Sequence, residues 1–381
     1  MRRTRVVATI GPASWDPVTL QSVFDAGADV FRLNYSHGEP EQKTELYERI
    51  RSMETETRKT CILADLPGPK LRLGEFSGVR LLNNGDNIRF LCGKKVHDGD
   101  ELPVEYDGLS SELSPGDSVL IADGLIRLSV VKTGGERGSF VDCLVEDGGP
   151  VTSRKGINLP GTTIDLPAIG EKDKLALDHA LKTGADWIAV SYVRSAEDLR
   201  PAKDAVKAAG LHTPIIAKIE HPAALKNLHS ILDIADAVMV ARGDLGVEIP
   251  LERVPLAQQM IIDAGLMRGM VVIVATQMLE SMTLNPRPTR AEVSDVSTAI
   301  RQGSTAVMLS GETASGNHPV AAVETMTRIA TATEEGLDSS GGTPGVLSKF
   351  RSTRAVAHAG VELARASGAK HIIVATQHGN A

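Results

Sequence analysis

Short runs of apolar residues recur along most of the chain, separated by stretches that have the spacing of amphipathic helices. The apolar runs do not alternate with polar residues, which is the pattern of parallel strands buried on both faces. The intervening stretches 171–184 and 251–268 are helical in spacing, and Gly27 and Gly184 stand where such stretches end before a strand. The expected strands lie at 5–10, 29–33, 61–65, 187–191, 214–219, 236–241, 271–276 and 304–309. Eight βα repeats predict an α/β protein built on a closed (β/α)8, or TIM, barrel.

The third and fourth expected strands are separated by about 120 residues of a different character. Residues 74–157 are rich in Gly, Asp and Val, with short runs at 118–122, 126–131 and 139–145 in which apolar and polar residues alternate. Turn-forming pairs lie among these runs, namely Asn84-Gly85, Asp98-Gly99, Asp107-Gly108, Pro115-Gly116 and Asp123-Gly124. We therefore expect 70–160 to be a small antiparallel β domain inserted in a barrel loop. The barrel is then formed by 1–69 and 161–340, which together match the roughly 250 residues of a plain barrel.

The C-terminal part of the chain begins with a linker rich in Ser, Gly, Thr and Pro at 339–344. A helix is expected at 351–367 and a strand at 371–376. One helix and one strand cannot bury a core of their own. We therefore expect 345–381 to be the start of an incomplete C-terminal α/β domain.

Composition and charge exclude several classes of function. The 381 residues are 42% hydrophobic and 23% charged, with a formal net charge of -7, so a phosphate backbone is repelled and no nucleic-acid partner is expected. The three cysteines, Cys61, Cys92 and Cys143, have no metal-ligand spacing and are expected to be reduced thiols. No segment has the length and apolarity of a membrane span or a signal peptide. The expected location is the cytoplasm.

Polar side chains cluster at the ends of the expected strands, where the active sites of such barrels lie. Carboxylates, lysines and several arginines around one mouth suit phosphoryl chemistry assisted by Mg²⁺. The rim residues are Arg32, Asn34, Ser36, His37, Asp65, Lys70, Arg72, Lys218, Glu220, Arg242, Gly243, Asp244, Thr276, Ser310 and Glu312.

Each of these features also has a purely structural explanation. Lys218 and Glu220 on one strand face are equally a structural ion pair, and the run 242–244 is a common turn sequence. Asp65 is also explained as a cap of the barrel mouth, and His37 as a hydrogen-bonding loop residue. The convergence of all of them on one rim favours a site. No P-loop, dinucleotide fingerprint or nucleophile elbow competes with that interpretation.

At these residues the sequence resembles the pyruvate kinase family, in family order over roughly residues 4–340. The blocks 239–250 (MVARGDLGVEIP) and 275–290 carry the most specific similarity. The other matching segments are 8–14 (ATIGPAS), 32–38 (RLNYSHG), 155–161 (KGINLPG), 218–220 (KIE) and 308–314 (MLSGETA). Fold by itself does not imply function, so the expectation rests on these motifs.

The resemblance implies a role for each matching residue in Mg²⁺-dependent phosphoryl transfer from phosphoenolpyruvate to ADP, giving pyruvate and ATP in glycolysis. Glu220 and Asp244 are implied to hold the divalent cation, which is Mg²⁺ or Mn²⁺. Lys218 and Arg32 are implied to contact the transferring phosphoryl group. Gly243, Asp244 and Thr276 are implied to bind the substrate carboxylate, and a relay near Thr276 and Ser310 is implied to protonate the enolate. The residues implied to bind the nucleotide phosphates are Asn34, His37, Arg72 and Lys155.

Two departures from the family pattern modify these expectations. Many family members bind K⁺ near a threonine and a glutamate that are replaced here by Leu66 and Lys70. The fixed charge of Lys70, in a region that also includes Asn34, Ser36 and Asp65, predicts an enzyme that does not require K⁺; drift at a non-critical loop position is the alternative. The second departure is at 376–381, where the chain ends inside the loop that binds a phosphorylated effector in family members. Family resemblance otherwise implies a homotetramer. It also implies that 1–69 and 161–340 are the catalytic barrel and that 70–160 is a small antiparallel β-barrel that acts as a lid domain, in which Asp123 resembles a residue that reaches the nucleotide.

Two other functions remain as alternatives. One is a Mg²⁺-dependent aldolase or lyase that stabilises a pyruvate enolate, which would have no use for the nucleotide-side residues or the lid. The other is a non-catalytic regulator that binds a phosphometabolite, which the presence of Lys218, Glu220 and Asp244 disfavours. Turnover of phosphoenolpyruvate distinguishes a regulator from an enzyme.

Overall fold

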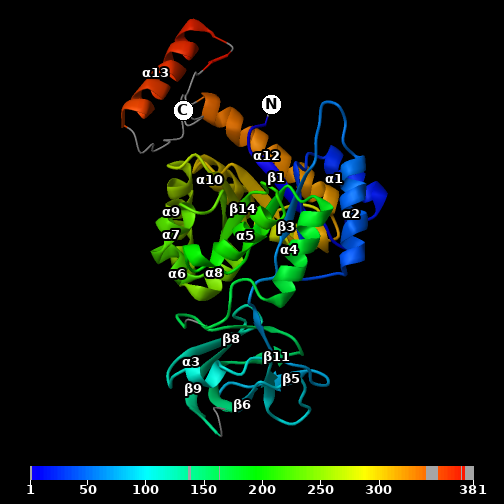
Figure 1. Cartoon of the computed structure of the whole chain (residues 1–381), viewed down its shortest axis with the longest axis vertical. Coiled ribbons are helices and arrows are strands. Elements are labelled where there is room, and N and C mark those ends of the chain that lie inside the picture. The colour runs from blue at the N-terminus through cyan, green and yellow to red at the C-terminus, as the bar shows by residue number, and fades with distance from the viewer. Residues whose placement is uncertain (1, 136–138, 163, 340–350, 370, 374–381) are drawn as a thin grey trace.

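The computed structural model describes residues 2–135, 139–162, 164–339, 351–369 and 371–373. Figure 1 shows the barrel in the middle of the molecule, with the inserted β-rich region at one end. The chain N-terminus and the last helix lie toward the opposite end.

The eight expected strands are all present and form a closed parallel barrel. Their order around the barrel is β1-β17-β16-β15-β14-β13-β3-β2, and β1 closes the ring by pairing with both β2 and β17. The strands are β1 (Arg5–Thr9), β2 (Val30–Asn34), β3 (Cys61–Asp65), β13 (Trp187–Val190), β14 (Ile215–Ile219), β15 (Ala237–Ala241), β16 (Val271–Ala275) and β17 (Ala306–Leu309). The predicted (β/α)8 barrel is confirmed.

Helices alternate with these strands and surround them (Figure 1). Their ends follow the expected local chemistry: Asp16 caps α1 by accepting from the Thr19 N–H, and Gly184 ends α4 in the left-handed conformation with φ 87°. The helical elements of the barrel are α1 (Pro17–Asp25), α2 (Pro40–Ser52), α4 (Glu171–Thr183), η1 (Ala196–Leu199), α5 (Arg200–Ala208), α6 (Pro222–Lys226), α7 (Leu228–Leu232), α8 (Arg242–Glu248), η2 (Leu251–Arg253), α9 (Val254–Leu266), η3 (Glu280–Thr283), α10 (Arg290–Arg301), α11 (Gly311–Ala314) and α12 (Pro319–Ser339).

The barrel has two apolar layers, which explains why its strands do not alternate with polar residues. Along β1, Val6 and Ala8 belong to the layer packed under the helices, whereas Val7 belongs to the layer inside the barrel. Both layers are built from buried aliphatic side chains. Polar side chains are therefore concentrated at the strand ends, where the site lies.

The insertion forms a seven-stranded sheet in the order β4-β12-β8-β9-β10-β6-β7, together with a two-stranded ribbon of β11 and β5. The sheet is not purely antiparallel, because residues 93–101 carry the chain back so that β6 and β7 pair in parallel. The chain enters the sheet in β4 and leaves it in β12, and these two strands pair with each other. The elements are β4 (Leu71–Arg72), β5 (Arg80–Leu82), β6 (Asn87–Cys92), β7 (Leu102–Val104), α3 (Leu109–Glu112), β8 (Ser118–Ile121), β9 (Ile126–Gly134), β10 (Phe140–Asp147), β11 (Gly149–Val151) and β12 (Gly156–Asn158).

The described C-terminal residues contain the predicted helix, α13 (Arg351–Ser367). The strand expected at 371–376 is not present at 371–373, and 374–376 lie outside the described residues. The expected linker at 339–344 also lies outside them, apart from Ser339 at the end of α12. The proposed domain boundaries remain predictions. Within the described part of the chain, no helix combines the length and apolarity needed to cross a membrane.

Candidate active site

A continuous chain of charged side chains lies across the C-terminal mouth of the barrel. The Arg32 Nε donates to Asp65 Oδ2 at 2.7 Å, joining β2 to the end of β3. The Lys218 Nζ on β14 lies 3.1 Å from Asp65 Oδ1 and 3.0 Å from Glu220 Oε1. Its third partner is the Ser191 Oγ, which accepts at 2.7 Å. Because parallel strands end on the same side of a barrel, residues far apart in sequence form one polar group here.

Each charge in this chain is stabilised by the next one. Burial acts to raise the pKa of Asp65, but the Lys218 and Arg32 cations more than offset it and hold that pKa below its ordinary value. Burial acts to lower the pKa of Lys218, but the Asp65 and Glu220 carboxylates outweigh it and raise that pKa. Lys218 and Asp65 are therefore both ionised at neutral pH, although only 8% and 1% of their surfaces are exposed.

Glu220 and Asp244 are the two carboxylates expected to hold a divalent cation. The second oxygen of Glu220 accepts from the Tyr192 N–H at 2.7 Å, which fixes the orientation of the carboxylate. Burial raises the pKa of Glu220; Lys218 opposes this rise and the nearby Asp244 carboxylate adds to it. A cation between the two carboxylates would relieve that repulsion.

The donor set fits Mg²⁺ or Mn²⁺. In the described residues, no group of three or more His, Cys, Asp or Glu side chains is arranged to hold a metal ion. Mg²⁺ is commonly held by one or two carboxylates and completes its shell with water and substrate phosphates. A two-carboxylate site with oxygen ligands only is therefore of the expected kind.

Gly243 and Thr276, two residues of the expected carboxylate-binding group, are in direct contact. The Gly243 N–H donates to the Thr276 Oγ1 at 2.7 Å, and that hydroxyl donates to the Ala275 carbonyl at 2.6 Å. Thr276 has φ 69°, which is unfavourable for a β-branched residue and is frequent at functional sites. Arg242 holds this turn by donating to the Thr276 carbonyl at 2.8 Å and pairing with Asp295 at 2.7 Å. Arg242 is therefore a structural support of the rim.

Ser310, the other residue expected near the proton relay, follows β17. Its hydroxyl oxygen is buried and has no hydrogen-bond partner among the described residues. Its N–H donates to Glu312 Oε2 at 2.7 Å, and Glu312 Oε1 accepts from the Leu279 N–H at 3.0 Å. Glu312 is fully buried and organises backbone, whereas the Ser310 hydroxyl remains available. No hydrogen bond joins Ser310 to Thr276 in the described part of the chain.

The expected nucleotide-side residues lie on the loop after β2 and on the strands that connect the insertion. The Asn34 Oδ1 accepts from the Ser36 N–H at 2.9 Å, which shapes the loop before His37. Partial burial, then the cations Arg72, Lys43 and Arg32, lower the pKa of His37, so this imidazole lies among positive charges. Arg72 and Lys155 are exposed on the paired strands β4 and β12 or next to them.

A cleft of about 750 Å³ lies between the barrel and the insertion. Arg72 and Ser36 line it, whereas Asn34, His37 and Lys155 do not. Its lining contains further basic residues that the sequence analysis did not select, namely Lys43, Arg154 and Lys172. Lys43 follows the 32–38 motif by five residues and its Nζ donates to the His37 carbonyl, so its proximity to the motif was an available signal. Ser191 was also missed, although it ends an expected strand as the other rim residues do.

Lys70 contacts the insertion and the predicted metal site. Its Nζ lies 3.1 Å from Asp123 Oδ1 and 3.4 Å from Asp244 Oδ1. Burial acts to lower the pKa of Lys70, but Asp244 and Asp123 outweigh it and raise that pKa. Among the described residues, no hydrogen bond or ion pair joins Lys70 to Asn34, Ser36 or Asp65. The Lys70 ammonium is therefore fixed and charged, but it lies beside Asp244 and not in the expected region.

Leu66, the residue expected in the same region, is buried. Its carbonyl accepts from the Ser191 Oγ at 2.7 Å. Leu66 therefore connects the end of β3 to the end of β13 through its backbone.

Comparison with known proteins identifies the family to which this site belongs. Residues 1–323 match the family model described as the pyruvate kinase barrel domain. The chain belongs to the pyruvate kinase family. It is 46% identical over 338 residues to a pyruvate kinase of Agrobacterium vitis, covering 88% of this chain and 70% of that protein. It is 43% identical over 382 aligned positions to one of Mycobacterium tuberculosis, covering 100% and 80%. With one of Methylorubrum extorquens the identity is 48% over 331 residues, covering 86% and 68%.

Membership of the pyruvate kinase family makes this chain an enzyme of the phosphotransferase class. The matched residues 1–323 include the whole barrel mouth and the insertion. The ionic chain, the carboxylate pair and the basic cleft therefore all lie in the part of the chain that carries the family similarity.

Proposed function

We propose that this pyruvate kinase transfers the phosphoryl group of phosphoenolpyruvate to ADP with Mg²⁺ as the divalent cation and without a requirement for K⁺. The observation that carries the proposal is the chain from Arg32 through Asp65 and Lys218 to Glu220, with Asp244 beside it. Two fixed cations, beside three carboxylates of which Glu220 and Asp244 could hold a divalent cation, supply the positive charge that an enzyme needs to bring two anionic reactants together. Without them, the repulsion would amount to several kcal/mol in a dry site (on the order of 4 kcal/mol for a pair of unit charges near a protein surface).

Glu220 and Asp244 are proposed as the protein ligands of the divalent cation. When bound, that cation supplies Lewis-acid neutralisation of charge on substrate oxygens. The Tyr192 N–H orients Glu220, and the position of Asp244 at the start of α8 leaves it partly exposed to the mouth.

Lys218 and Arg32 are proposed to bind the transferring phosphoryl group. Arg32 uses its Nε for Asp65 and one terminal nitrogen for Thr9, so its other terminal nitrogen has no partner among the described residues. The three protons of Lys218 are matched by Ser191, Asp65 and Glu220. Lys218 therefore reaches a phosphoryl oxygen by giving up one of these partners.

The remaining roles concern the carboxylate, the nucleotide and water. The Gly243 N–H and the Thr276 hydroxyl are proposed to bind the substrate carboxylate by exchanging their present hydrogen bonds to the Thr276 oxygen and the Ala275 carbonyl. The unpaired Ser310 hydroxyl is proposed to take part in proton delivery to the enolate. The basic cleft under the insertion is proposed to hold the ADP phosphates, with Arg72, Lys155, Asn34 and His37 around it. Closure of the insertion over the mouth would exclude the water that hydrolyses the phosphoryl donor.

Independence from K⁺ is supported by the fixed charge of Lys70. Its contacts with Asp123 and Asp244 place a permanent cation at the junction of barrel and insertion, and its raised pKa keeps it charged. Such a charge performs the electrostatic task of a bound monovalent ion.

The test is a lactate-dehydrogenase-coupled assay with phosphoenolpyruvate, ADP and Mg²⁺, run with and without K⁺ at constant ionic strength. We expect pyruvate formation at similar rates in both conditions and its loss in Lys218→Met. Strong activation by K⁺ would refute the monovalent-ion proposal and leave the kinase activity standing. A chain that binds phosphoenolpyruvate without consuming it would instead be the non-catalytic regulator.

Assembly into a homo-oligomer, a tetramer by family resemblance, and a cytoplasmic location are further proposals. Leu251 in η2 and Leu256 and Met260 in α9 are exposed to 73%, 72% and 43%. An apolar cluster of exposed large side chains on these two consecutive helical elements supports contact with a second copy of the chain.

A further inference from the structure

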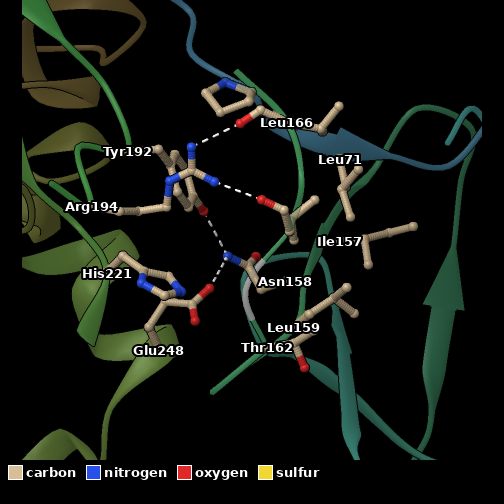
Figure 2. Close-up of a pocket in the computed structure, with 12 residues that line it drawn as sticks. Leu71, Ile157, Asn158, Leu159, Thr162, Leu166, Tyr192, Arg194, His221 and Glu248 are labelled. Carbon is tan, nitrogen blue, oxygen red and sulfur yellow. Dashed lines mark hydrogen bonds between the residues drawn. The ribbon is translucent and has the colours of Figure 1, made fainter. Parts of the chain in front are cut away.

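The strand by which the chain leaves the insertion carries a buried asparagine that faces the barrel. Asn158 is the last residue of β12 and is 2% exposed. Its Nδ2 donates to the Tyr192 hydroxyl at 2.8 Å and to Glu248 Oε1 at 3.1 Å, so both amide protons are used on barrel side chains. Figure 2 shows the amide between these two partners. The side chain therefore connects the exit strand of the insertion to two separate barrel elements.

Each of the two hydrogen-bond partners of Asn158 is connected to one of the predicted metal ligands. Tyr192 follows β13, and its N–H donates to Glu220 Oε2 at 2.7 Å. Glu248 is the last residue of α8, the short helix that contains Asp244 near its start. Asn158 is thus one hydrogen bond from the residue that orients Glu220 and one from the helix that positions Asp244.

Backbone strain at Tyr192 indicates that this arrangement is enforced by its surroundings. Tyr192 has φ 54°, a left-handed conformation that is an outlier for a bulky side chain. Such a conformation persists only where neighbouring contacts over-determine it, and it occurs preferentially at functional sites. Asn158 holds the hydroxyl of the Tyr192 side chain, and Glu220 holds its backbone N–H.

Two acceptor atoms of the cluster have no protein partner among the described residues. The Asn158 Oδ1 and the Glu248 Oε2 are buried and have no hydrogen-bond partner among the described residues. Both residues line a cavity of about 20 Å³ at the junction of the barrel and the insertion (Figure 2). A polar cavity of this volume has room for about one water molecule that hydrogen-bonds to both acceptors, so the role of Asn158 follows from the contacts of its amide protons.

The return segment after Asn158 is held to the barrel independently. Arg194 donates to the Ile164 carbonyl at 2.6 Å and to the Leu166 carbonyl at 2.8 Å, as Figure 2 shows, and pairs with Asp198. Loss of the Asn158 amide would therefore leave the connection between barrel and insertion in place. Loss of the Asn158 amide should therefore affect only the groups that this amide orients, Tyr192 and Glu248.

We propose that Asn158 is a positioning residue that couples the exit strand of the insertion to both carboxylates of the metal pair, through Tyr192 to Glu220 and through Glu248 to the helix of Asp244. The inference rests on the proposed role of Glu220 and Asp244 as ligands of the divalent cation. Residues that orient metal ligands change metal affinity by about 10- to 100-fold when they are removed.

The test is direct binding of Mn²⁺, measured from the electron paramagnetic resonance signal of the free ion, for the full chain and four variants. We expect Asn158→Ala to raise the Kd for Mn²⁺ about tenfold, and Tyr192→Phe, which keeps its backbone N–H, to raise it about threefold. The double variant should bind no more weakly than Asn158→Ala, because both substitutions act on the same contact. The matched control is Asn227→Ala, which removes a similar side-chain donor to the Arg194 carbonyl at 2.9 Å without a path to either carboxylate and should leave the Kd unchanged.

The outcomes separate this proposal from a merely structural role and from failure of the proposed function. Wild-type Mn²⁺ affinity in Asn158→Ala, or strictly additive effects in the double variant, would overturn it even if the variants were less stable. If Asn158→Ala does not fold, Tyr192→Phe decides: an unchanged Kd overturns the proposal and a raised Kd supports it. A wild-type chain that neither binds Mn²⁺ nor forms pyruvate would remove the proposed function itself, and this inference with it.

Discussion

Asp65 provides the sharpest test of the ionic chain, because it is the anion between two buried cations. Its carboxylate lies 2.7 Å from the Arg32 Nε and 3.1 Å from the Lys218 Nζ, and it is 1% exposed. At an effective dielectric constant of about 20, the Lys218 contact alone corresponds to roughly 5 kcal/mol of attraction, much of which offsets the desolvation of the charges. Asp65→Asn removes the charge and keeps the shape, which leaves Arg32 without its carboxylate partner and Lys218 with Glu220 alone. We expect the free energy of unfolding to fall by about 3–5 kcal/mol, the cost of removing one partner of a buried pair.

The assay is urea denaturation followed by circular dichroism. With an m-value of about 3 kcal/mol/M, the midpoint should fall by roughly 1 M or more. The difference between wild type and variant should depend on pH, because the folded-state pKa of Asp65 is lowered from its ordinary value of 3.8. The stabilisation is present above that ordinary value and is lost as the pH falls through the lowered pKa, where the protonated Asp65 resembles Asn. An unchanged midpoint at neutral pH would refute the claim that Asp65 holds the two cations together.

Asp173 offers a matched control, since it is also a buried aspartate but forms no ion pair within the described part of the chain. It accepts from the Gly68 and Gly170 N–H groups at 2.7 and 3.0 Å. Burial raises its pKa above the ordinary value of 3.8. Its wild-type stability therefore falls as the pH rises through that raised pKa, and Asp173→Asn removes this dependence. The same substitution should thus become more costly with rising pH at Asp65 and less costly at Asp173.

Three further predictions follow from single contacts. Lys70→Glu should make turnover depend on K⁺ by roughly tenfold or more, because it removes the fixed cation beside Asp244; equal rates with and without K⁺ in the coupled assay would contradict this. Burial raises the pKa of Glu248 above 4.5, so the stability of the wild type should fall as the pH rises through that pKa. In Glu248→Gln the urea midpoint should therefore depend less on pH. If the midpoints of the two proteins change with pH in parallel, Glu248 does not cause the pH dependence. Leu256→Lys should reduce the mass measured by light scattering, because it places a charge in the exposed apolar cluster; an unchanged mass would exclude that cluster as the interface.

Much of the site was predictable because it follows from local pattern. Arg32, Asp65 and Lys218 lie at the ends of strands that are recognisable from their apolar runs, and parallel strands must end at one mouth. Asn158, by contrast, lies in a segment whose sequence indicates only that the chain returns from the insertion to the barrel. Its partners Tyr192 and Glu248 are 34 and 90 residues away, and no local pattern joins the three.

The direction of a side chain was the least predictable property. Arg242 stands among the rim residues in sequence, yet its guanidinium is turned to Asp295 and the Thr276 carbonyl. Lys70 was expected near Asn34 and Ser36, but its long side chain reaches Asp123 and Asp244 instead. Long side chains reach several neighbours, so only the folded surroundings select one of them.

The sequence by itself determined the eight-stranded barrel, the place of the insertion and most of the polar and charged residues at the mouth, though not Ser191. These depend on the burial of apolar strand residues on both faces and on turn chemistry, which act over a few residues. Only the tertiary structure decided which charges pair, which turns are strained, as at Thr276 and Tyr192, and how Asn158 connects the insertion to Glu220 and Asp244. Ion pairing, backbone strain and burial depend on side chains from distant segments that pack together only in the fold. Their contributions to the free energy arise only when folding removes the water between those side chains.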